Sequence, residues 1–180
     1  MRNLKPYLIL SLLMAFLSVS CERDDICPGS TPTTPRVVID LYDFENQESS
    51  KNVFGLLAAG IENEFILSGY NIITTNQLVL PLKTDDNTTQ YVLIEDTSIN
   101  DNGTPNDSSD DFYNGNSDVI TINYSREEVY VSRACGYKTI FKNVTITIED
   151  DGDNWIQSQQ PLNPNQSVED ETTAHFNIYH

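Results

Sequence analysis

Apolar and polar residues alternate with a period of two along most of the chain after residue 35. This period is typical of strands that bury one face, because successive side chains point to opposite sides of a sheet. It is clearest in residues 36–43, 119–124 and 143–149. The pattern therefore predicts short strands around a common apolar core.

Further strands are expected where β-branched and aromatic residues cluster between turn residues. Pro81 interrupts one of them and predicts a sheet edge, since proline cannot donate a hydrogen bond to a strand ladder. Gly55 and Gly60 predict a bulge or close packing in another. These further strands are residues 53–61, 65–75, 78–82, 89–95, 129–135, 154–159 and 174–179.

Three polar segments predict the connections between strands. Asp96–Asp118 forms a long loop, which at this length is either disordered or functional. Ser125–Glu128 predicts a turn, and Asp150–Asp153 predicts a hairpin turn. Because the chain shows no long helical period and no repeat, we expect an all-β fold, a two-sheet antiparallel β-sandwich that is Ig-like or similar.

The first residues carry a different pattern. Arg2 and Lys5 precede a charge-free, mostly apolar run over residues 7–19, which is typical of a secretory signal helix and too short to span a bilayer. Cys21 follows this run, and the arrangement resembles the lipobox of bacterial lipoproteins, with Ser18 where a leucine is usual. The resemblance implies that Cys21 is acylated and becomes the first residue of the mature chain.

These signals divide the chain into three expected parts. Residues 1–20 form a lipoprotein signal peptide, residues 21–35 an acidic, proline-rich tether, and residues 36–180 a single β-sandwich domain. The expected location is the outer membrane, lipid-anchored, with the cell surface favoured over the periplasmic face. That preference rests on acidic residues that resemble a sorting signal of some Bacteroidetes lipoproteins: Glu22, Asp24 and Asp25.

The chain is strongly acidic, with 10 Lys and Arg residues, 27 Asp and Glu residues and a formal net charge of −17. Loss of the signal would remove Arg2 and Lys5 but no acid, and would lower the charge to −19. Nucleic acid is disfavoured as a partner, because phosphate binding needs clustered cations. The acidity favours solubility and self-repulsion, with cation binding as the alternative.

Three cysteines are present, and acylation of Cys21 would leave Cys27 and Cys135 as a pair. Export places this pair in an oxidising compartment, so a disulfide between them is predicted. The bridge would fasten the lipid-proximal tether to the folded domain. The alternative is a metal site that adds His175 and His180, whose spacing matches no zinc pattern.

Four blocks stand out: CERDDICPGSTPTTPRVVIDLYD at residues 21–43, VYVSRACGYKTIFKNV at 129–144, DNWI at 153–156 and AHFNIYH at 174–180. They resemble an uncharacterised Bacteroidetes lipoprotein family, a domain of unknown function. The resemblance implies a secreted, lipid-anchored domain. It carries over no catalytic residue, because none is established for the family.

The chain offers little for hydrolytic chemistry. Its only histidines are His175 and His180, no G-x-S-x-G elbow is present, and alternation places His175 outward, opposite Phe176. Paired carboxylates of the glycosidase kind would be coincidental among so many acids. The single tryptophan, Trp155, is expected in the core or at its rim rather than as a sugar platform.

Calcium is considered because aspartates gather in residues 101–118 and 150–153. The EF-hand spacing fails in both segments, since Ser98 and Thr147 stand at the first ligand position. A solvated loop is the expectation, with a structural Ca²⁺ as the alternative. We assign no metal ligand, no cofactor and no catalytic residue.

These observations favour a non-catalytic binding or assembly module of the cell envelope. Its expected partners are the membrane, through the lipid, and an unknown envelope protein or glycan. A carbohydrate-binding or adhesion domain that uses Trp155 and the loop tyrosines is the second hypothesis. An unrecognised hydrolase is the third.

Overall fold

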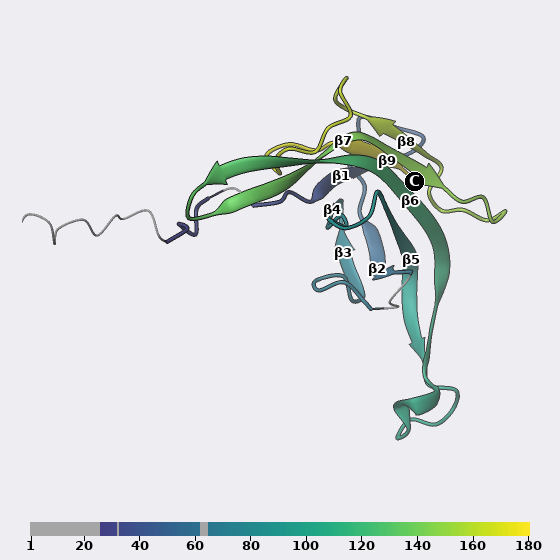
Figure 1. The fold of residues 1–180 in the computed structure, drawn as a ribbon. Coiled ribbons are helices and arrows are strands. Elements are labelled where there is room, and N and C mark those ends of the chain that lie inside the picture. The colour runs from purple at the N-terminus through teal and green to yellow at the C-terminus, as the bar shows by residue number, and fades with distance from the viewer. Residues whose placement is uncertain (1–25, 32, 62–64) are drawn as a thin grey trace, which may run out of the picture. The chain divides into compact units, whose positions relative to one another are not determined.

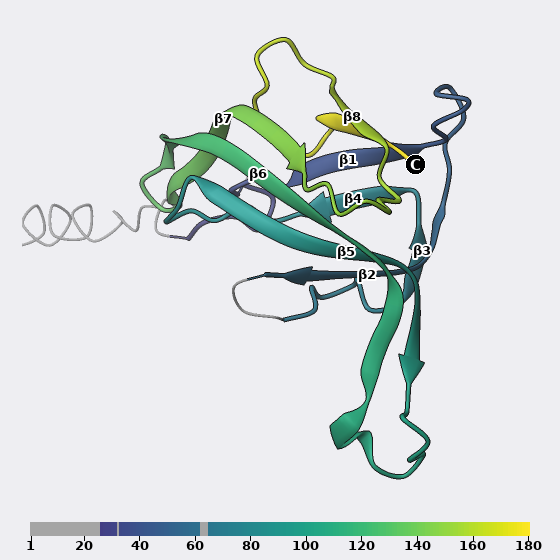
Figure 2. The same cartoon turned by 90° about the vertical axis from the view of Figure 1, so that its right-hand side faces the viewer.

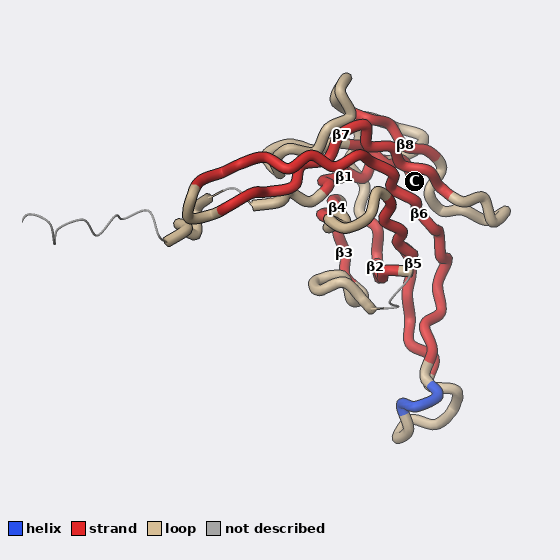
Figure 3. The backbone as a smooth tube through the Cα atoms, viewed as in Figure 1, coloured by secondary structure: helices blue, strands red, loops and turns tan. Residues whose placement is uncertain are grey.

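The computed structural model describes residues 26–31, 33–61 and 65–180. The expected signal helix, Cys21 and the acidic sorting residues lie outside these ranges. The described chain holds nine β-strands and one short 3₁₀ helix, η2 (Ser108–Asp110) (Figures 1 and 3). Within the same ranges, no helix is long and apolar enough to cross a membrane.

Contacts divide the chain into two compact units. The sandwich unit comprises Pro32–Val129 and Lys138–His180. The tip unit joins the N-terminal segment, through Thr31, to Tyr130–Tyr137. Its described part is therefore residues 26–31 and 130–137.

One sheet of the sandwich unit has four strands in the order β4-β1-β9-β8. β1 lies beside β4, with which it pairs antiparallel (Figure 2). It pairs parallel with β9, so the expected all-antiparallel pairing is wrong at β1–β9. β4 lies at the sheet edge and ends just before Pro81, which confirms the predicted edge. The strands are β1 (Val37–Tyr42), β4 (Gln77–Leu80), β8 (Ser158–Pro161) and β9 (Phe176–Tyr179).

The other sheet has five strands in the order β3-β2-β5-β6-β7. The β2–β3 register shifts between Val53 and Leu56, and Gly55 between them has a φ of 57°, which confirms the bulge predicted at this glycine. The strands are β2 (Val53–Gly60), β3 (Ile73–Thr75), β5 (Thr88–Asn100), β6 (Phe112–Ser132) and β7 (Gly136–Ile148).

The two sheets of the sandwich unit enclose one apolar core, as the alternation predicts. Every second residue of the main strands points inward and is buried, because removing apolar surface from water stabilises the folded chain. The fold is therefore a two-sheet β-sandwich. The inward residues include Val37, Ile39, Leu41, Leu78, Leu80, Phe176 and Ile178 from the first sheet and Leu56, Leu93, Ile120, Ile122, Val144 and Ile146 from the second.

The predicted turn at Ser125–Glu128 is wrong, because β6 runs without interruption from Phe112 to Ser132. The four side chains of this stretch are exposed, and two of them bond to a neighbouring strand or loop. Ser125 Oγ donates to the Lys142 carbonyl over 3.1 Å, and Arg126 Nε donates to Asn87 Oδ1 over 2.9 Å. A strand segment that is exposed on both faces needs no apolar residues. Its run of polar residues therefore resembles the sequence of a turn.

The predicted hairpin at Asp150–Asp153 is also wrong. The segment bends, with Gly152 N donating to Asp150 Oδ1 over 3.1 Å, but it does not join paired strands. β7 ends one sheet and β8 ends the other, so residues 149–157 carry the chain from sheet to sheet. Residues 154–157, expected to be the returning strand, lie in this connection, and β8 begins at Ser158.

The long loop predicted at Asp96–Asp118 is shorter than expected. β5 continues to Asn100 and β6 begins at Phe112, so residues 101–111 remain as the loop. The ends of both strands are mostly polar, so they lack the apolar alternation that predicts a strand. They form a hairpin that Figure 3 shows with the 3₁₀ turn in its loop.

Candidate functional site

The end of the β5–β6 hairpin carries large apolar side chains in water. Asn100 pairs with Phe112, Ile99 with Tyr113, and Ser98 with Asn114. Together with the loop of residues 101–111, these pairs are called the arm. It lies in the sandwich unit and is visible at the lower end of the hairpin in Figure 1.

The arm begins at a bulge between β5 and β6, next to the bulge of β2. The β5–β6 register shifts between Glu95 and Ser98, and Asp96 has a φ of 48°. Gly115 opposite has a φ of 150°, and a Cβ there would lie 2.5 Å from the Glu95 carbonyl oxygen. A Cβ on Gly55 would lie 3.0 Å from Thr97 N. The two glycines let the backbones approach where the ladder is interrupted.

The loop of the arm is closed by its own carboxylates. Asp110 accepts from Asn102 Nδ2 at 3.1 Å and from Thr104 Oγ1 at 2.8 Å. Asp107 accepts from Ser109 Oγ at 2.6 Å and from Ser109 N at 3.0 Å. These hydrogen bonds lower the pKa values of Asp107 and Asp110, so both are ionised at neutral pH. Among the described residues no group of three or more His, Cys, Asp or Glu is placed to hold a metal ion.

Three apolar side chains of the arm are exposed: Ile99 (58%), Phe112 (48%) and Tyr113 (44%). We call them the arm patch. They line a shallow cleft of about 270 Å³ together with Ser108 and Asp111. An apolar surface with an ionised rim is typical of a protein-binding surface.

A second cleft, of about 430 Å³, opens beside the start of β2 in the sandwich unit. Two of its polar side chains are held by hydrogen bonds. Lys51 Nζ donates to the His180 main-chain oxygen over 2.8 Å, and Ser50 Oγ accepts from Asn76 Nδ2 over 2.8 Å. The lining residues are Ser50, Lys51, Asn52, Val53, Phe54, Glu95, Asp96, Trp155 and His180.

The titratable groups of this second cleft are shifted by burial. Desolvation raises the pKa of Glu95, helped by the charges of Asp96 and Asp118, and desolvation lowers the pKa of His180. The His180 ring meets the Trp155 ring edge to face, with 5.6 Å between centroids. Ser50, the hydroxyl of the cleft, bonds to Leu41 and Asn76 rather than to His180. The cleft therefore offers no hydroxyl activated by a base.

Asp118, expected in the solvated loop and among the possible calcium ligands, is instead a buried charge in β6. Its side chain has no exposed surface, and it accepts from Ile156 N at 2.8 Å and from Trp155 N at 3.3 Å. Desolvation raises its pKa, and these hydrogen bonds oppose the shift. The signal was present, since Asp118 alternates with Ile120 and Ile122 on the inward face. The carboxylate fastens the connection between the sheets.

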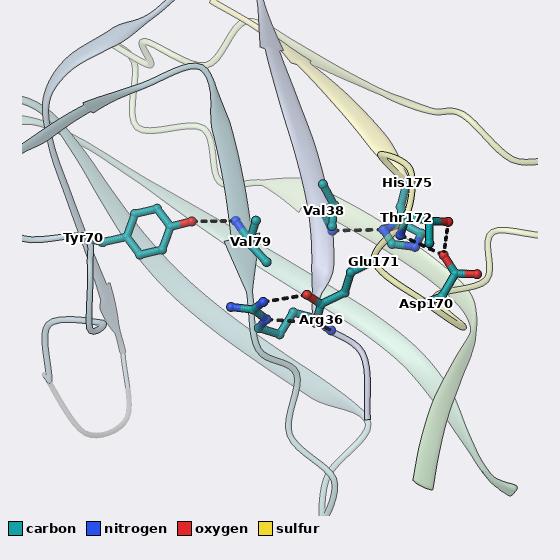
Figure 4. A network of polar contacts seen from close by, with 8 residues as sticks. All are labelled: Arg36, Val38, Tyr70, Val79, Asp170, Glu171, Thr172 and His175. Atoms are coloured by element: carbon teal, nitrogen blue, oxygen red, sulfur yellow. Dashed lines mark hydrogen bonds and ion pairs between the residues drawn. The ribbon is translucent and has the colours of Figure 1, made fainter. Parts of the chain in front are cut away.

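His175 is buried, at 6% exposure, so the predicted outward position is wrong. Its Nδ1 accepts a hydrogen bond from Val38 N over 3.0 Å, and desolvation lowers its pKa. Figure 4 shows the ring among polar contacts between β1 and the segment before β9. Arg36 forms a two-pronged pair with Glu171, at 2.9 and 2.5 Å, in the same network. The histidine therefore joins β1 to this segment instead of facing solvent.

Trp155 lies in the core at 6% exposure, as expected, and its Nε1 donates to the Leu93 carbonyl over 3.2 Å. Its ring is therefore not available for stacking on a sugar. The predicted disulfide is confirmed: Cys27 and Cys135 are bonded, with 4.8 Å between Cα atoms. This bridge lies within the tip unit and removes both cysteines from any metal site.

A model for a family of unknown function (DUF6452) matches residues 53–180. The match begins at β2, so it covers the arm, Cys135 and all of the second cleft except Ser50, Lys51 and Asn52, but not Cys27. No curated protein and no solved structure matches the chain.

Proposed function

The chain belongs to DUF6452, a family of unknown function, and we propose from its own geometry that it is a non-catalytic binding or assembly module. It works in a bacterial cell envelope, held to the outer membrane by a lipid on Cys21. Its partner is an envelope protein that docks on the arm patch.

The arm patch is the observation that carries this proposal. Ile99, Phe112 and Tyr113 are about half exposed on paired strands, which fix their positions before a partner arrives. Pre-ordered aromatic side chains lose little conformational entropy on binding, and such residues dominate many interfaces. Leaving these three apolar side chains in water is unfavourable unless another surface covers them.

Charge gives the class of partner. No Lys or Arg occurs in residues 84–125, whereas this stretch contains nine Asp and Glu residues. Asp107 and Asp110 stay ionised because their own loop hydrogen-bonds them. An apolar surface ringed by Lys or Arg therefore complements the arm, and the field of the carboxylates would speed its encounter.

The groups that could perform acid–base chemistry have structural partners, which supports binding over catalysis. His175 accepts from Val38 N, Asp118 accepts from the amides of Trp155 and Ile156, and Ser50 Oγ accepts from Asn76 Nδ2.

Carbohydrate binding is the second candidate, because the rings of Phe112 and Tyr113 are exposed on the arm. It would use the same patch, so one set of variants separates the two. Trp155 takes no part in it because the ring is buried.

Photo-crosslinking in native cells tests the proposal. A benzophenone amino acid at Tyr113 should give one dominant adduct with an envelope protein. The same group at Phe54, which is 62% exposed, is the control. Ile99→Ser with Phe112→Ser should abolish the adduct, and salt should weaken the purified complex. Equal adducts at both positions, or glycan-array binding lost in the double variant, would reject the protein partner.

Lipid attachment is tested separately. The resemblance of the first 21 residues to a lipoprotein signal supports acylation at Cys21. The likeness of the four sequence blocks to a Bacteroidetes lipoprotein family supports a bacterium of that group as the source. Labelled palmitate should enter the wild type but not Cys21→Ala. Label retained in the variant would reject this site.

Surface display is a further part of the proposal. Protease added to intact cells should remove the domain, and changing Glu22, Asp24 and Asp25 together to Ala should protect it. Cleavage seen only after lysis would place the wild type on the periplasmic face.

A further inference from the structure

The tip unit has an exposed apolar surface of its own. Ile26 is 80% exposed, Tyr130 59% and Tyr137 66%. The two tyrosine rings meet edge to face at 5.4 Å, and Ile26 and Tyr130 line one concave surface of about 630 Å³. The three side chains are therefore contiguous, and we call them the tip surface.

The disulfide links the tip surface to the segment that follows Cys21. Cys27 follows Ile26, and Cys135 lies two residues before Tyr137, so the bridge joins both halves of the tip unit. Cys27 lies six positions after Cys21, and a chain of that length reaches at most about 20–22 Å. A lipid on Cys21 thus keeps Cys27, and the tip surface that its disulfide joins, close to the bilayer.

The charge of the tip unit differs from that of the chain. The described part of the unit, residues 26–31 and 130–137, contains Arg133 and no carboxylate. Residues 129–148 contain three cations and no acid, in a chain with 27 acids. The tip surface itself therefore adds no carboxylate to the repulsion that phosphate headgroups exert on this acidic protein.

We propose that Ile26, Tyr130 and Tyr137 insert into the headgroup region of the membrane that holds Cys21, as a second membrane contact. Tyrosine favours this region because its ring is apolar and its hydroxyl remains hydrated. The lipid anchor supplies a high local concentration of membrane, so a contact too weak to bind alone is occupied once the protein is anchored. The proposal rests on the anchoring stated under Proposed function.

The test supplies the anchor chemically. In purified residues 21–180, Cys27 and Cys135 are bonded, so Cys21 is the one free thiol and couples to a maleimide lipid. Vesicles of phosphatidylethanolamine and phosphatidylglycerol with brominated chains then quench nearby tryptophan. Tyr137→Trp should be quenched and blue-shifted, whereas Phe54→Trp, matched in exposure, should not. The buried Trp155 is the constant background in both variants.

Ile26→Asp with Tyr130→Asp should remove most of the quenching of Tyr137→Trp, with circular dichroism as the check on folding. Quenching of Tyr137→Trp no greater than that of Phe54→Trp would overturn the proposal and leave the tip surface to a protein partner or a second copy. Because the anchor is chemical, this result is independent of native acylation. Failure of palmitate labelling in cells would reject the native anchor instead.

Discussion

Asp118 shows how one residue can connect the two sheets of the sandwich unit. Its carboxylate is desolvated, yet it accepts two main-chain amides from residues 155 and 156. Burial of a charge is costly unless it is hydrogen-bonded, and here the same bonds satisfy donors that would otherwise be buried without partners. We therefore expect Asp118 to act structurally.

Asp118→Ala should lower the free energy of unfolding by about 2–4 kcal/mol, because two buried N–H groups lose their acceptor. Asp118→Asn should cost less, since one oxygen remains as an acceptor. Urea unfolding followed by Trp155 fluorescence measures both changes. Equal stability of Asp118→Ala and wild type would contradict the structural role.

His175 should make the stability of the folded protein fall as the pH is lowered. Its folded-state pKa lies below its ordinary value, so the unfolded chain binds a proton first as pH falls. Stability is complete above pH of about 6.5 and falls as pH drops toward the lowered pKa. His175→Asn, which keeps a neutral acceptor, should lose less stability over this window.

Urea unfolding of both proteins between pH 7.5 and 5 measures the difference. His180 and the carboxylates of Glu95 and Asp118 titrate in both proteins, so their contributions cancel in the comparison. A parallel pH dependence of the two proteins would show that His175 is not the source.

Among the elements, the β5–β6 hairpin departs furthest from its sequence pattern. The ladder continues beyond the bulge at residues 95–98, where few side chains are buried and cross-strand pairs such as Ile99 with Tyr113 replace the core. The main-chain hydrogen bonds of the ladder, rather than burial, hold this part of the hairpin.

Gly115→Ala should destabilise the hairpin by more than about 1 kcal/mol, because the new Cβ would meet the Glu95 carbonyl and φ is positive. Gly103→Ala is the control, since its φ is also positive but nothing lies within 4 Å of a Cβ there. Thermal unfolding compares the two, and equal losses would mean that close approach at Gly115 has no special role.

Limited proteolysis should cut first within residues 101–111. It should spare residues 96–100 and 112–118, because both segments belong to the β5–β6 ladder. Proteinase K is suitable, since trypsin has no site between Lys83 and Arg126. Millimolar calcium should change the melting temperature little. A large increase reversed by chelator would instead support the structural Ca²⁺ alternative.

At the scale of the whole molecule, the disulfide closes the longest covalent loop of the described chain. It joins residues 108 positions apart and so restricts the unfolded ensemble strongly. Within the tip unit the same bond joins residues 26–31 to residues 130–137, and Cys135 Sγ contacts Thr31 Oγ1 at 3.6 Å. The bond therefore fixes the end of the tether against residues 130–137.

Changing Cys27 and Cys135 together to Ser should lower the free energy of unfolding by up to about 4–5 kcal/mol, the chain-entropy value for a loop of this length. Guanidinium unfolding with and without reductant measures it. Reductant should lower the free energy of unfolding of wild type to that of the variant, and it should not change the value for the variant. Unfolding of wild type unaffected by reduction would contradict this prediction.

The sequence by itself determined the β class, the inward residues of the main strands, the edge at Pro81, the bulge at Gly55 and the cysteine pair. Each depends on local chemistry: a period of two, a missing donor, an absent Cβ, or an even count of thiols once Cys21 is assigned to lipid.

The tertiary structure decided the rest. It made β1 and β9 parallel neighbours, continued β6 through Ser125–Glu128, and buried His175 and Asp118. It also brought Ile99 beside Tyr113. These features depend on which distant strands pair and which amides need an acceptor, and no local pattern records that choice, because hydrogen-bond satisfaction is a property of the assembled sheets.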